Sequence, residues 1–198
     1  QRAKEMVVYA DKLRKSTSVL IIGGGIVGVE LAAEIVTKYP NKSITIVHSK
    51  NELLERNPYK AREYTKNFFM SRNVRIIFNE RVVSKEGNAY KTDKGTKIGA
   101  NLAFLCVGVK PNYKPVKNLS KSLDEKKHIK VNQFLQVENL TNVFAAGDIN
   151  NIKEEKTAQN AEKQAKIAAQ NIVALEKDRP MNQYRSKPRP MIISLGKA

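Results

Sequence analysis

The feature that most constrains this chain is a glycine-rich turn between an apolar run and a helical pattern. Residues 19–22 are apolar, and the residues Gly-Gly-Gly-Ile-Val-Gly follow at positions 23–28. Strand, G-x-G-x-x-G and helix in this order predict the first turn of a dinucleotide-binding βαβ unit. In such a unit Gly23 permits the tight turn, Gly25 lets the backbone approach a pyrophosphate, and Gly28 lets the helix pack close to the sheet. The alternative is a glycine turn in another kind of α/β domain that binds no nucleotide.

The residues after the turn complete the unit. Apolar residues at helical spacing predict a helix from Ile26 to Lys38, and Pro40 ends it. A second strand is predicted at residues 43–48, so the whole βαβ unit spans about thirty residues. A bound pyrophosphate would lie at the positive N-terminus of the helix.

Further elements follow from the apolar pattern. Helices are predicted over residues 1–15, 51–72 and 157–175. Strands are predicted at residues 74–78, 81–84, 89–92, 96–98, 101–107, 128–131, 134–137 and 142–146. The residues expected on one face of the first helix are Met6, Val7, Ala10 and Leu13, and on that of the last helix Ala158, Ala161, Ala165, Ala168, Ile172 and Leu175. Turn residues at 86–88 and 93–95 indicate a small antiparallel layer, and the polar stretch 111–127 indicates a surface connection between two lobes.

Composition excludes several classes of protein. The 198 residues are 41% hydrophobic and 28% charged, which is typical of a globular chain, and no apolar run reaches the roughly 18 residues that span a bilayer. The single cysteine, Cys106, excludes an internal disulfide, a C-x-x-C redox pair and a cysteine-rich zinc site. His48 and His128 are too far apart in sequence to indicate a metal site, so no metal is expected.

The net charge of +17 raises the question of a nucleic-acid or membrane-surface partner. Lysine and arginine are scattered along the whole chain between acidic residues, and no dense basic run occurs. This distribution favours a generally solvated basic surface, so no specific nucleic-acid partner is expected.

A second motif, Asn-Val-Phe-Ala-Ala-Gly-Asp at residues 142–148, adds a family resemblance. Taken alone, it indicates a strand that ends in a Gly-Asp turn. The order of GGGxxGxE from Gly23, CVGxKPN from Cys106 and NVFAAGD up to Asp148 resembles the flavoproteins with two dinucleotide-binding domains, the pyridine nucleotide-disulfide oxidoreductase superfamily. Further likeness around residues 32–35, 39–40, 45–49 and 92–96 is to the apoptosis-inducing-factor-like and ferroptosis-suppressor-like branch.

The resemblance implies an α/β fold: a Rossmann-like NAD(P)-binding domain with a small antiparallel layer, plus the C-terminal part of an FAD-binding domain. The implied ranges are a connecting helix at 1–15, the NAD(P)H domain at 16–115 and the returning, incomplete part of the FAD domain at 116–198. Members of this family pass a hydride from NAD(P)H to FAD and then electrons to a quinone-like acceptor. A single cysteine leaves no dithiol relay, so direct transfer from flavin to a small-molecule acceptor is expected.

The resemblance also implies the site residues. It gives catalytic roles to Glu30, near the nicotinamide, and to Lys156, near the flavin ring. By residue chemistry alone, Glu30 is a first-turn glutamate favoured by the helix dipole. The NAD(P)H-binding positions implied are Gly23, Gly24, Gly25, Ile26, Val27, Gly28, His48, Ser49, Lys50, Val107 and Gly108, and the FAD-binding positions are Gly147, Asp148, Ala158 and Gln159.

One departure from the family concerns the nucleotide preference. NAD specificity usually rests on an acidic residue about twenty positions beyond the glycines, but this chain has His48, Ser49 and Lys50 there. No carboxylate would repel a 2′-phosphate, and Lys50 would attract one. Since His48 could equally serve NAD, both nucleotides stay open.

A second departure is that the family's first glycine fingerprint, which binds the ADP half of FAD, is missing from these residues. We therefore expect weak or lost FAD binding and no turnover by this chain on its own. The expected location is cytoplasmic, with membrane or mitochondrial association, including peripheral membrane contact, carried by other segments. Two alternatives remain: a non-catalytic NAD(P)H-binding module, and a basic, death-factor-like protein that contacts nucleic acid.

Overall fold

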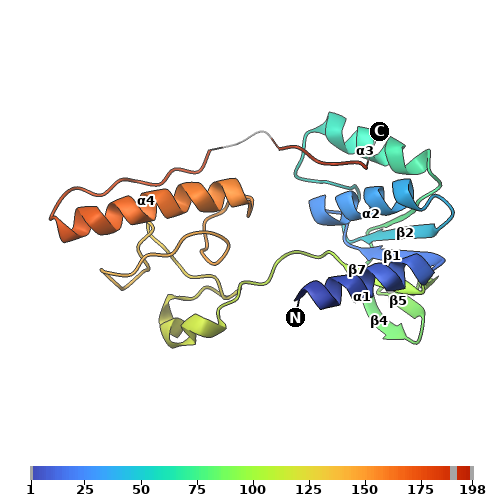
Figure 1. The fold of residues 1–198 in the computed structure, drawn as a ribbon, viewed down its shortest axis with the longest axis horizontal. Helices are drawn as coiled ribbons and strands as arrows, with labels where there is room; N and C mark the ends of the chain where they lie inside the picture. Colours follow the sequence, from blue (N-terminus) through green and yellow to red (C-terminus); the bar gives the residue numbers. More distant parts are fainter. Residues whose placement is uncertain (1, 188–190, 197–198) are drawn as a thin grey trace. The chain divides into compact units, whose positions relative to one another are not determined.

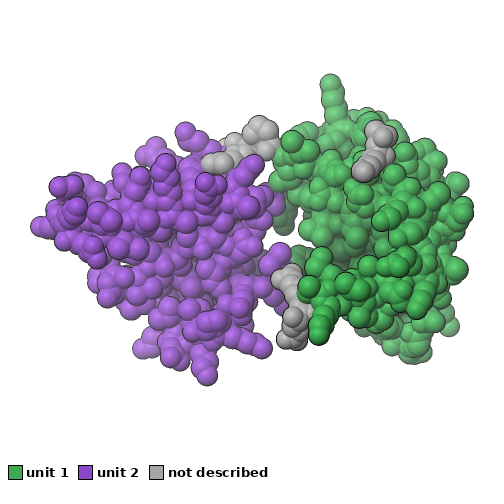
Figure 2. Space-filling view, in the orientation of Figure 1, with its two compact units in different colours: residues 1–108, 191–198 green, residues 109–190 purple. Residues whose placement is uncertain are grey.

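A computed structural model describes residues 2–187 and 191–196. The chain forms two compact units, unit 1 with residues 1–108 and 191–198 and unit 2 with residues 109–190, coloured separately in Figure 2. The boundary after Gly108 lies close to the start of the predicted polar connection at residues 111–127, whereas the resemblance implied a domain end at residue 115. The closing segment 191–198 belongs to unit 1, although the sequence places unit 2 before it.

Unit 1 is built around a four-stranded parallel sheet. Its strands are β1 (Ser18–Ile22), β2 (Ser43–His48), β3 (Arg75–Phe78) and β7 (Leu102–Leu105), in the order β3-β2-β1-β7. Its helices are α1 (Arg2–Lys15), α2 (Ile26–Lys38) and α3 (Tyr59–Met70). The predicted bounds of α2 and β2 are confirmed, and the mixed α/β fold with a parallel sheet is as expected.

Both faces of the parallel sheet are covered (Figure 1). Helices α2 and α3 lie on one face, where Val19 and Ile21 of β1 are buried. The antiparallel sheet of β4 (Val82–Glu86), β5 (Ala89–Thr92) and β6 (Lys97–Gly99) lies on the other face, where Leu20 packs with Tyr90. Burial on both faces explains why β1 is a continuous apolar run rather than an alternating one.

Two expectations for unit 1 are wrong. Residues 51–57 form turns and not the first part of a helix, because this segment folds back onto the glycine turn and α3 starts only at Tyr59. In α1, the helix itself is confirmed, but the expected apolar face is not a packing face. Met6 and Val7 are 69% and 66% exposed, and only Leu13 reaches the core.

Unit 2 has little regular structure besides the 3-10 segment η1 (Lys114–Ser122) and helix α4 (Ala158–Glu176). The strands predicted at 128–131, 134–137 and 142–146 are wrong, since the described residues form only isolated bridges there. Leu135 is fully buried but has a positive φ of 67°, which breaks an extended strand. The side chain of Asn132 also accepts hydrogen bonds from the backbone of Phe134 and Gln136, which closes a turn at this point.

The buried face of α4 differs from the expected alanine face. Ala158 and Ala165 are exposed, and Ile172 and Leu175 are 43% and 40% exposed. The residues of α4 that are buried are Asn160, Gln164, Ala168, Asn171 and Ala174. The buried polar side chains on this face form hydrogen bonds with other groups of unit 2. Within residues 2–187 and 191–196, each helix is too short or too polar to cross a bilayer.

Candidate functional site

The glycine turn between β1 and α2 has a distinct geometry at each glycine. Gly23 has φ +112°, a conformation that favours glycine, and its N–H donates to the Val47 carbonyl at 2.8 Å. A Cβ on Gly28 would collide with the carbonyl oxygen of Gly23, so the expected close packing of the helix start is confirmed. A Cβ on Gly25 would meet nothing within 4 Å. Backbone atoms therefore leave no room for a side chain at Gly23 and Gly28, so the turn is closed there. The space beside Gly25 is free, so the turn is open at that position.

Gly24 is fixed from two directions by residues far along the chain. Its N–H donates to Nδ1 of His48 at 3.0 Å in a buried hydrogen bond, and its carbonyl accepts from the N–H of Leu54 at 3.0 Å. A Cβ on Gly24 would clash with the side chains of Leu53 and His48. Leu53 and Leu54 are 2% and 1% exposed, so the 51–57 segment forms a buried brace for the turn.

His48 joins this brace through its second ring nitrogen. Nε2 lies 3.2 Å from Oε2 of Glu55. Because Nδ1 accepts from Gly24, the hydrogen of a neutral ring lies on Nε2 and points to that carboxylate. Burial works to raise the pKa of Glu55, but its backbone hydrogen bond and His48 outweigh burial and lower it. His48 cannot offer either nitrogen to a ribose without giving up one of these contacts.

The start of α2 presents hydrogen-bond donors beside the open glycine. The first backbone hydrogen bond at this end runs from the N–H of Val29 to the carbonyl of Gly25 at 2.9 Å. N–H groups in the first turn of a helix have no partner within the helix, and Gly25 has no side chain to cap them. Ile26 is half-buried and Val27 is 64% exposed. These amides and the helix dipole form a place for an anion.

Other predicted NAD(P)H positions lie at the carboxyl ends of β2 and β7. Ser49 is half-buried and Lys50 is exposed, directly after β2. Val107 is 65% exposed, and Gly108 has φ +105° after β7. Because parallel strands end at one edge of a sheet, these positions and the glycine turn share the carboxyl edge. Burial raises the pKa of the neighbouring Cys106 thiol, which fits a structural cysteine.

Glu30 lies one turn into α2 and is half-buried. Its Oε1 accepts a hydrogen bond from the N–H of Ser194 at 3.0 Å, and the Ser194 hydroxyl lies 3.3 Å from Oε1 of Glu34. The closing segment thus runs along the exposed side of α2. The catalytic role implied for Glu30 stays a prediction.

In unit 2, the Gly147–Asp148 turn lies against the first turns of α4. Gly147 has φ +82°, and a Cβ there would lie 3.5 Å from that of Ala161. The carboxylate of Asp148 is exposed, and so are Ala158 and Gln159 at the helix start. Thr157 caps the helix by accepting from the N–H of Asn160 at 3.3 Å. The four predicted FAD positions therefore gather near one helix N-terminus.

Lys156, the second predicted catalytic residue, is already engaged. Its Nζ lies 2.8 Å from the carbonyl of Asn150, 3.3 Å from Oδ1 of the same residue and 3.3 Å from the carbonyl of Ile152. Burial lowers the pKa of Lys156, and the carboxylates of Asp148 and Glu154 oppose that shift. An ammonium group has three N–H donors, and here all three have acceptors. A role at the flavin stays a prediction.

A buried polar network that the sequence analysis missed holds the Gly147 turn. Oε1 of Gln164 accepts from the N–H of Gly147 at 2.7 Å and from Nδ2 of Asn150 at 2.6 Å, while its Nε2 donates to Glu154 at 2.5 Å. The hydroxyl of Tyr184 also donates to Glu154 at 2.7 Å. The available signal was the helical spacing of Asn160, Gln164 and Asn171 within α4. For the glycine turn, the signal was the isolated apolar pair Leu53 and Leu54.

Comparisons with known proteins agree with this geometry. The family model described as pyridine nucleotide-disulphide oxidoreductase matches residues 4–165. Ferroptosis suppressor protein 1 of Homo sapiens is 35% identical over 203 residues, covering 96% of this chain and 54% of that protein. The same protein of Mus musculus is 34% identical, with coverages of 94% and 53%. Apoptosis-inducing factor homolog A of Dictyostelium discoideum is 34% identical, with coverages of 94% and 52%. The chain spans about half the length of these curated relatives.

Solved structures show the same fold. A ferredoxin reductase from Rhodopseudomonas palustris matches with a TM-score of 0.77 and 20% identity, over 93% of this chain and 47% of that one. The water-forming NADH oxidase of Lactobacillus brevis, bound to NADH, matches with a TM-score of 0.74 and 21% identity, over 90% and 40% of the two chains. With the glycine turn, the Gly-Asp turn and the family match in agreement, the chain belongs to the pyridine nucleotide-disulphide oxidoreductase family.

Proposed function

We propose that this chain is the NAD(P)H-binding portion of an FAD-dependent oxidoreductase that reduces a quinone-like small molecule. The observation that carries the proposal is the open position at Gly25, between a turn closed by Gly23 and Gly28 and the free first-turn amides of α2. A pyrophosphate fits there because the backbone can approach it closely and the helix dipole favours its charge.

The residues of unit 1 would bind and orient the nicotinamide nucleotide. The amides at the start of α2 would hold the pyrophosphate, and the brace of His48 and Leu54 would keep Gly24 fixed beneath it. Lys50 is exposed beyond β2 and would attract a 2′-phosphate. The exposed Val107 and Gly108 would border the cofactor at the same edge of the sheet.

The flavin part of the proposal rests on unit 2. The exposed carboxylate of Asp148 would accept hydrogen bonds from FAD hydroxyls, and the α4 N-terminus beside it would favour an anionic group. The Gln164 network would keep that turn in place. When bound, NAD(P)H supplies a hydride and FAD accepts it and passes electrons on. Lys156 would hold the backbone of Asn150 beside this turn, and its implied role near the flavin ring is part of the proposal.

Nucleotide titration of the chain tests the central step. Wild-type protein is expected to bind NADH or NADPH in isothermal titration calorimetry, and Gly25→Val is expected to weaken that binding at least tenfold. The free energy of unfolding should change by less than about 1 kcal/mol, because the new side chain enters open space.

Gly99→Val is the matched control, since a Cβ on Gly99 also meets nothing within 4 Å and Gly99 lies in β6, away from the glycine turn. It should bind like wild type. The proposal fails if wild type binds neither nucleotide, or if both variants bind equally well.

The flavin and the acceptor are tested on a chain of the relatives' full length. Such a protein should purify with FAD and oxidise NAD(P)H faster when a soluble quinone is added. NAD(P)H binding without any flavin would instead support the alternative of a non-catalytic nucleotide-binding module.

A further inference from the structure

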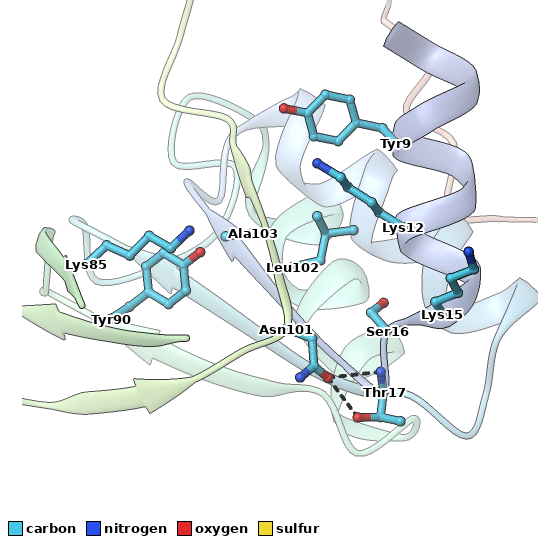
Figure 3. Close-up of a pocket in the computed structure, with 10 residues that line it drawn as sticks. All are labelled: Tyr9, Lys12, Lys15, Ser16, Thr17, Lys85, Tyr90, Asn101, Leu102 and Ala103. Carbon is cyan, nitrogen blue, oxygen red and sulfur yellow. Dashed lines mark hydrogen bonds between the residues drawn. The ribbon is translucent and has the colours of Figure 1, made fainter. Parts of the chain in front are cut away.

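Unit 1 has a recess away from the glycine turn. It has a volume of about 610 Å³ and is lined by α1, the residues before β1 and β7, and the antiparallel sheet (Figure 3). Ser16 and Thr17 precede β1, whereas the glycine turn follows this five-residue strand. At about 3.3 Å per residue, the two places lie on the order of 16 Å apart, at opposite ends of the strand.

The recess gathers more positive charge than the neighbouring acidic residues compensate. Three lysines line it: Lys12 and Lys15 from α1, and Lys85 from β4. Lys15 pairs with Asp11 at 2.8 Å. Lys12 and Lys85 form no ion pair with any residue of the described chain, and each lies over a tyrosine ring instead, at 5.3 Å and 5.5 Å from the centroid. None of the described lining residues is acidic.

A buried tyrosine with an unused hydroxyl faces the same space. Tyr90 is only 7% exposed, and its ring packs with Leu20 and Ile98 in the core below the parallel sheet. Its hydroxyl donates to no group in residues 2–187 or 191–196. In Figure 3 the polar ends of Tyr90 and Lys85 point toward those of Tyr9 and Lys12 on the opposite wall. The hydroxyl oxygen itself reaches the open space of the recess, so it can donate to a group bound there.

From these observations we propose that this recess binds a phosphate group, either as free phosphate or as a small phosphate monoester. The two unpaired ammonium groups would share its charge, and the Tyr90 and Tyr9 hydroxyls would donate to its oxygens. Leu102 and Ala103 from β7 add an apolar part to the wall of the recess. This site is separate from the proposed nucleotide site and does not depend on it.

Residue-resolved NMR of the chain tests the proposal, with inorganic phosphate and glycerol 3-phosphate as probes at constant ionic strength. Saturable shifts are expected at the amides of Thr17, Asn101 and Leu102. Glycerol, which carries no charge, should cause none. A preference for one anionic probe identifies the source of the phosphate. Any phosphate at the glycine turn would shift residues 24–28 instead, so the two sites are read separately.

Variants decide whether the named side chains are responsible. Lys12→Ala with Lys85→Ala should weaken binding at least tenfold, and Tyr90→Phe, which keeps the core ring, about threefold. The matched control, Lys91→Ala with Lys94→Ala, removes the same charge from exposed positions outside the recess and should bind within twofold of wild type. The proposal is overturned if wild type gives no saturable shifts at these amides, or if both double variants lose the same affinity.

Discussion

The hydrogen bond between Gly24 and His48 links two segments that lie 24 residues apart. The Gly24 N–H is buried, and its acceptor is a side chain, the ring Nδ1 of His48. The imidazole supplies that acceptor through Nδ1, and its Nε2–H donates a hydrogen bond to the carboxylate of Glu55. His48, the last residue of β2 and one of the nucleotide-specificity positions, is therefore part of the turn's support.

Replacing His48 tests this support. We expect His48→Leu to lower the free energy of unfolding by about 1–3 kcal/mol, because the buried Gly24 N–H loses its acceptor. His48→Asn keeps an oxygen near the position of Nδ1 and should lose less than half of that amount. Urea unfolding of both variants measures the difference. Equal losses would show that packing, and not the hydrogen bond, sets the cost.

Lys50 offers a test of nucleotide preference. Because its side chain is exposed beyond β2, Lys50→Glu should leave stability within about 0.5 kcal/mol of wild type. The new carboxylate would repel a 2′-phosphate, so NADPH affinity should fall about tenfold more than NADH affinity. Calorimetric titration with both nucleotides measures the ratio, with Lys97→Glu in β6 as the control of equal charge. An unchanged ratio of NADPH to NADH affinity would show that Lys50 does not contact the 2′-phosphate.

Among the elements, α4 shows how a helix can bury polar residues when each has a partner. Its inward residues Asn160, Gln164 and Asn171 all form side-chain hydrogen bonds to loops of unit 2. Apolar periodicity alone selected the alanine row, because that pattern assumes an apolar core. Here loop backbone groups and amides lie beside a small apolar cluster, so the polar side chains pack inward together with Ala168 and Ala174, whereas Ala158 and Ala165 are exposed.

A pair of substitutions in neighbouring positions distinguishes the two faces of α4. Gln164→Leu leaves the Gly147 N–H and the Asn150 amide without an acceptor, and should cost about 2–4 kcal/mol. Ala165→Leu adds a similar side chain on the exposed face and should change stability by less than about 0.5 kcal/mol. Thermal unfolding followed by circular dichroism compares them. A larger loss of stability for Ala165→Leu than for Gln164→Leu would show that the alanine row is the buried face of α4.

At the scale of the whole molecule, the two units rest on different interactions. Unit 1 has an apolar core on both faces of a sheet, whereas unit 2 combines two small apolar clusters with the Glu154 network. Burial works to raise the pKa of Glu154, but hydrogen bonds from Ser186, Tyr184 and Gln164 outweigh it and lower the pKa below its ordinary value of 4.5.

This lowered pKa predicts that unit 2 loses stability in acid. The contribution of Glu154 is complete above pH 4.5 and is lost as the pH falls through the lowered pKa of the folded state, because protonation then favours the unfolded chain. Urea midpoints at about pH 7 and about pH 3.5 should differ less in Glu154→Gln than in wild type. Glu162→Gln on the exposed side of α4 is the control. An equal acid loss in all three proteins would contradict the assignment.

Some features of the candidate sites follow from the spacing of residues in the sequence, and others arise only when distant segments fold together. The βαβ unit, the glycine turn and the family motifs lie in short contiguous stretches, so the roles of Gly23 and Gly28 follow from sequence. The sequence pattern predicts a helix over the brace at residues 51–57, because the local composition does not reveal that the Leu54 N–H donates to the Gly24 carbonyl. The resemblance gives Lys156 a role near the flavin ring, and only the fold shows that its ammonium group lies against the Asn150 carbonyl.

The sequence by itself determined the nucleotide-type turn, the parallel sheet and the family, because each is specified by residues within one or two elements. Only the tertiary structure decided which face of α4 is buried, which residues hold Gly24 and Gly147, and that Tyr90 and Lys85 face α1 across a recess. Those features depend on contacts between distant segments. A local sequence pattern does not show which distant segment will pack against it.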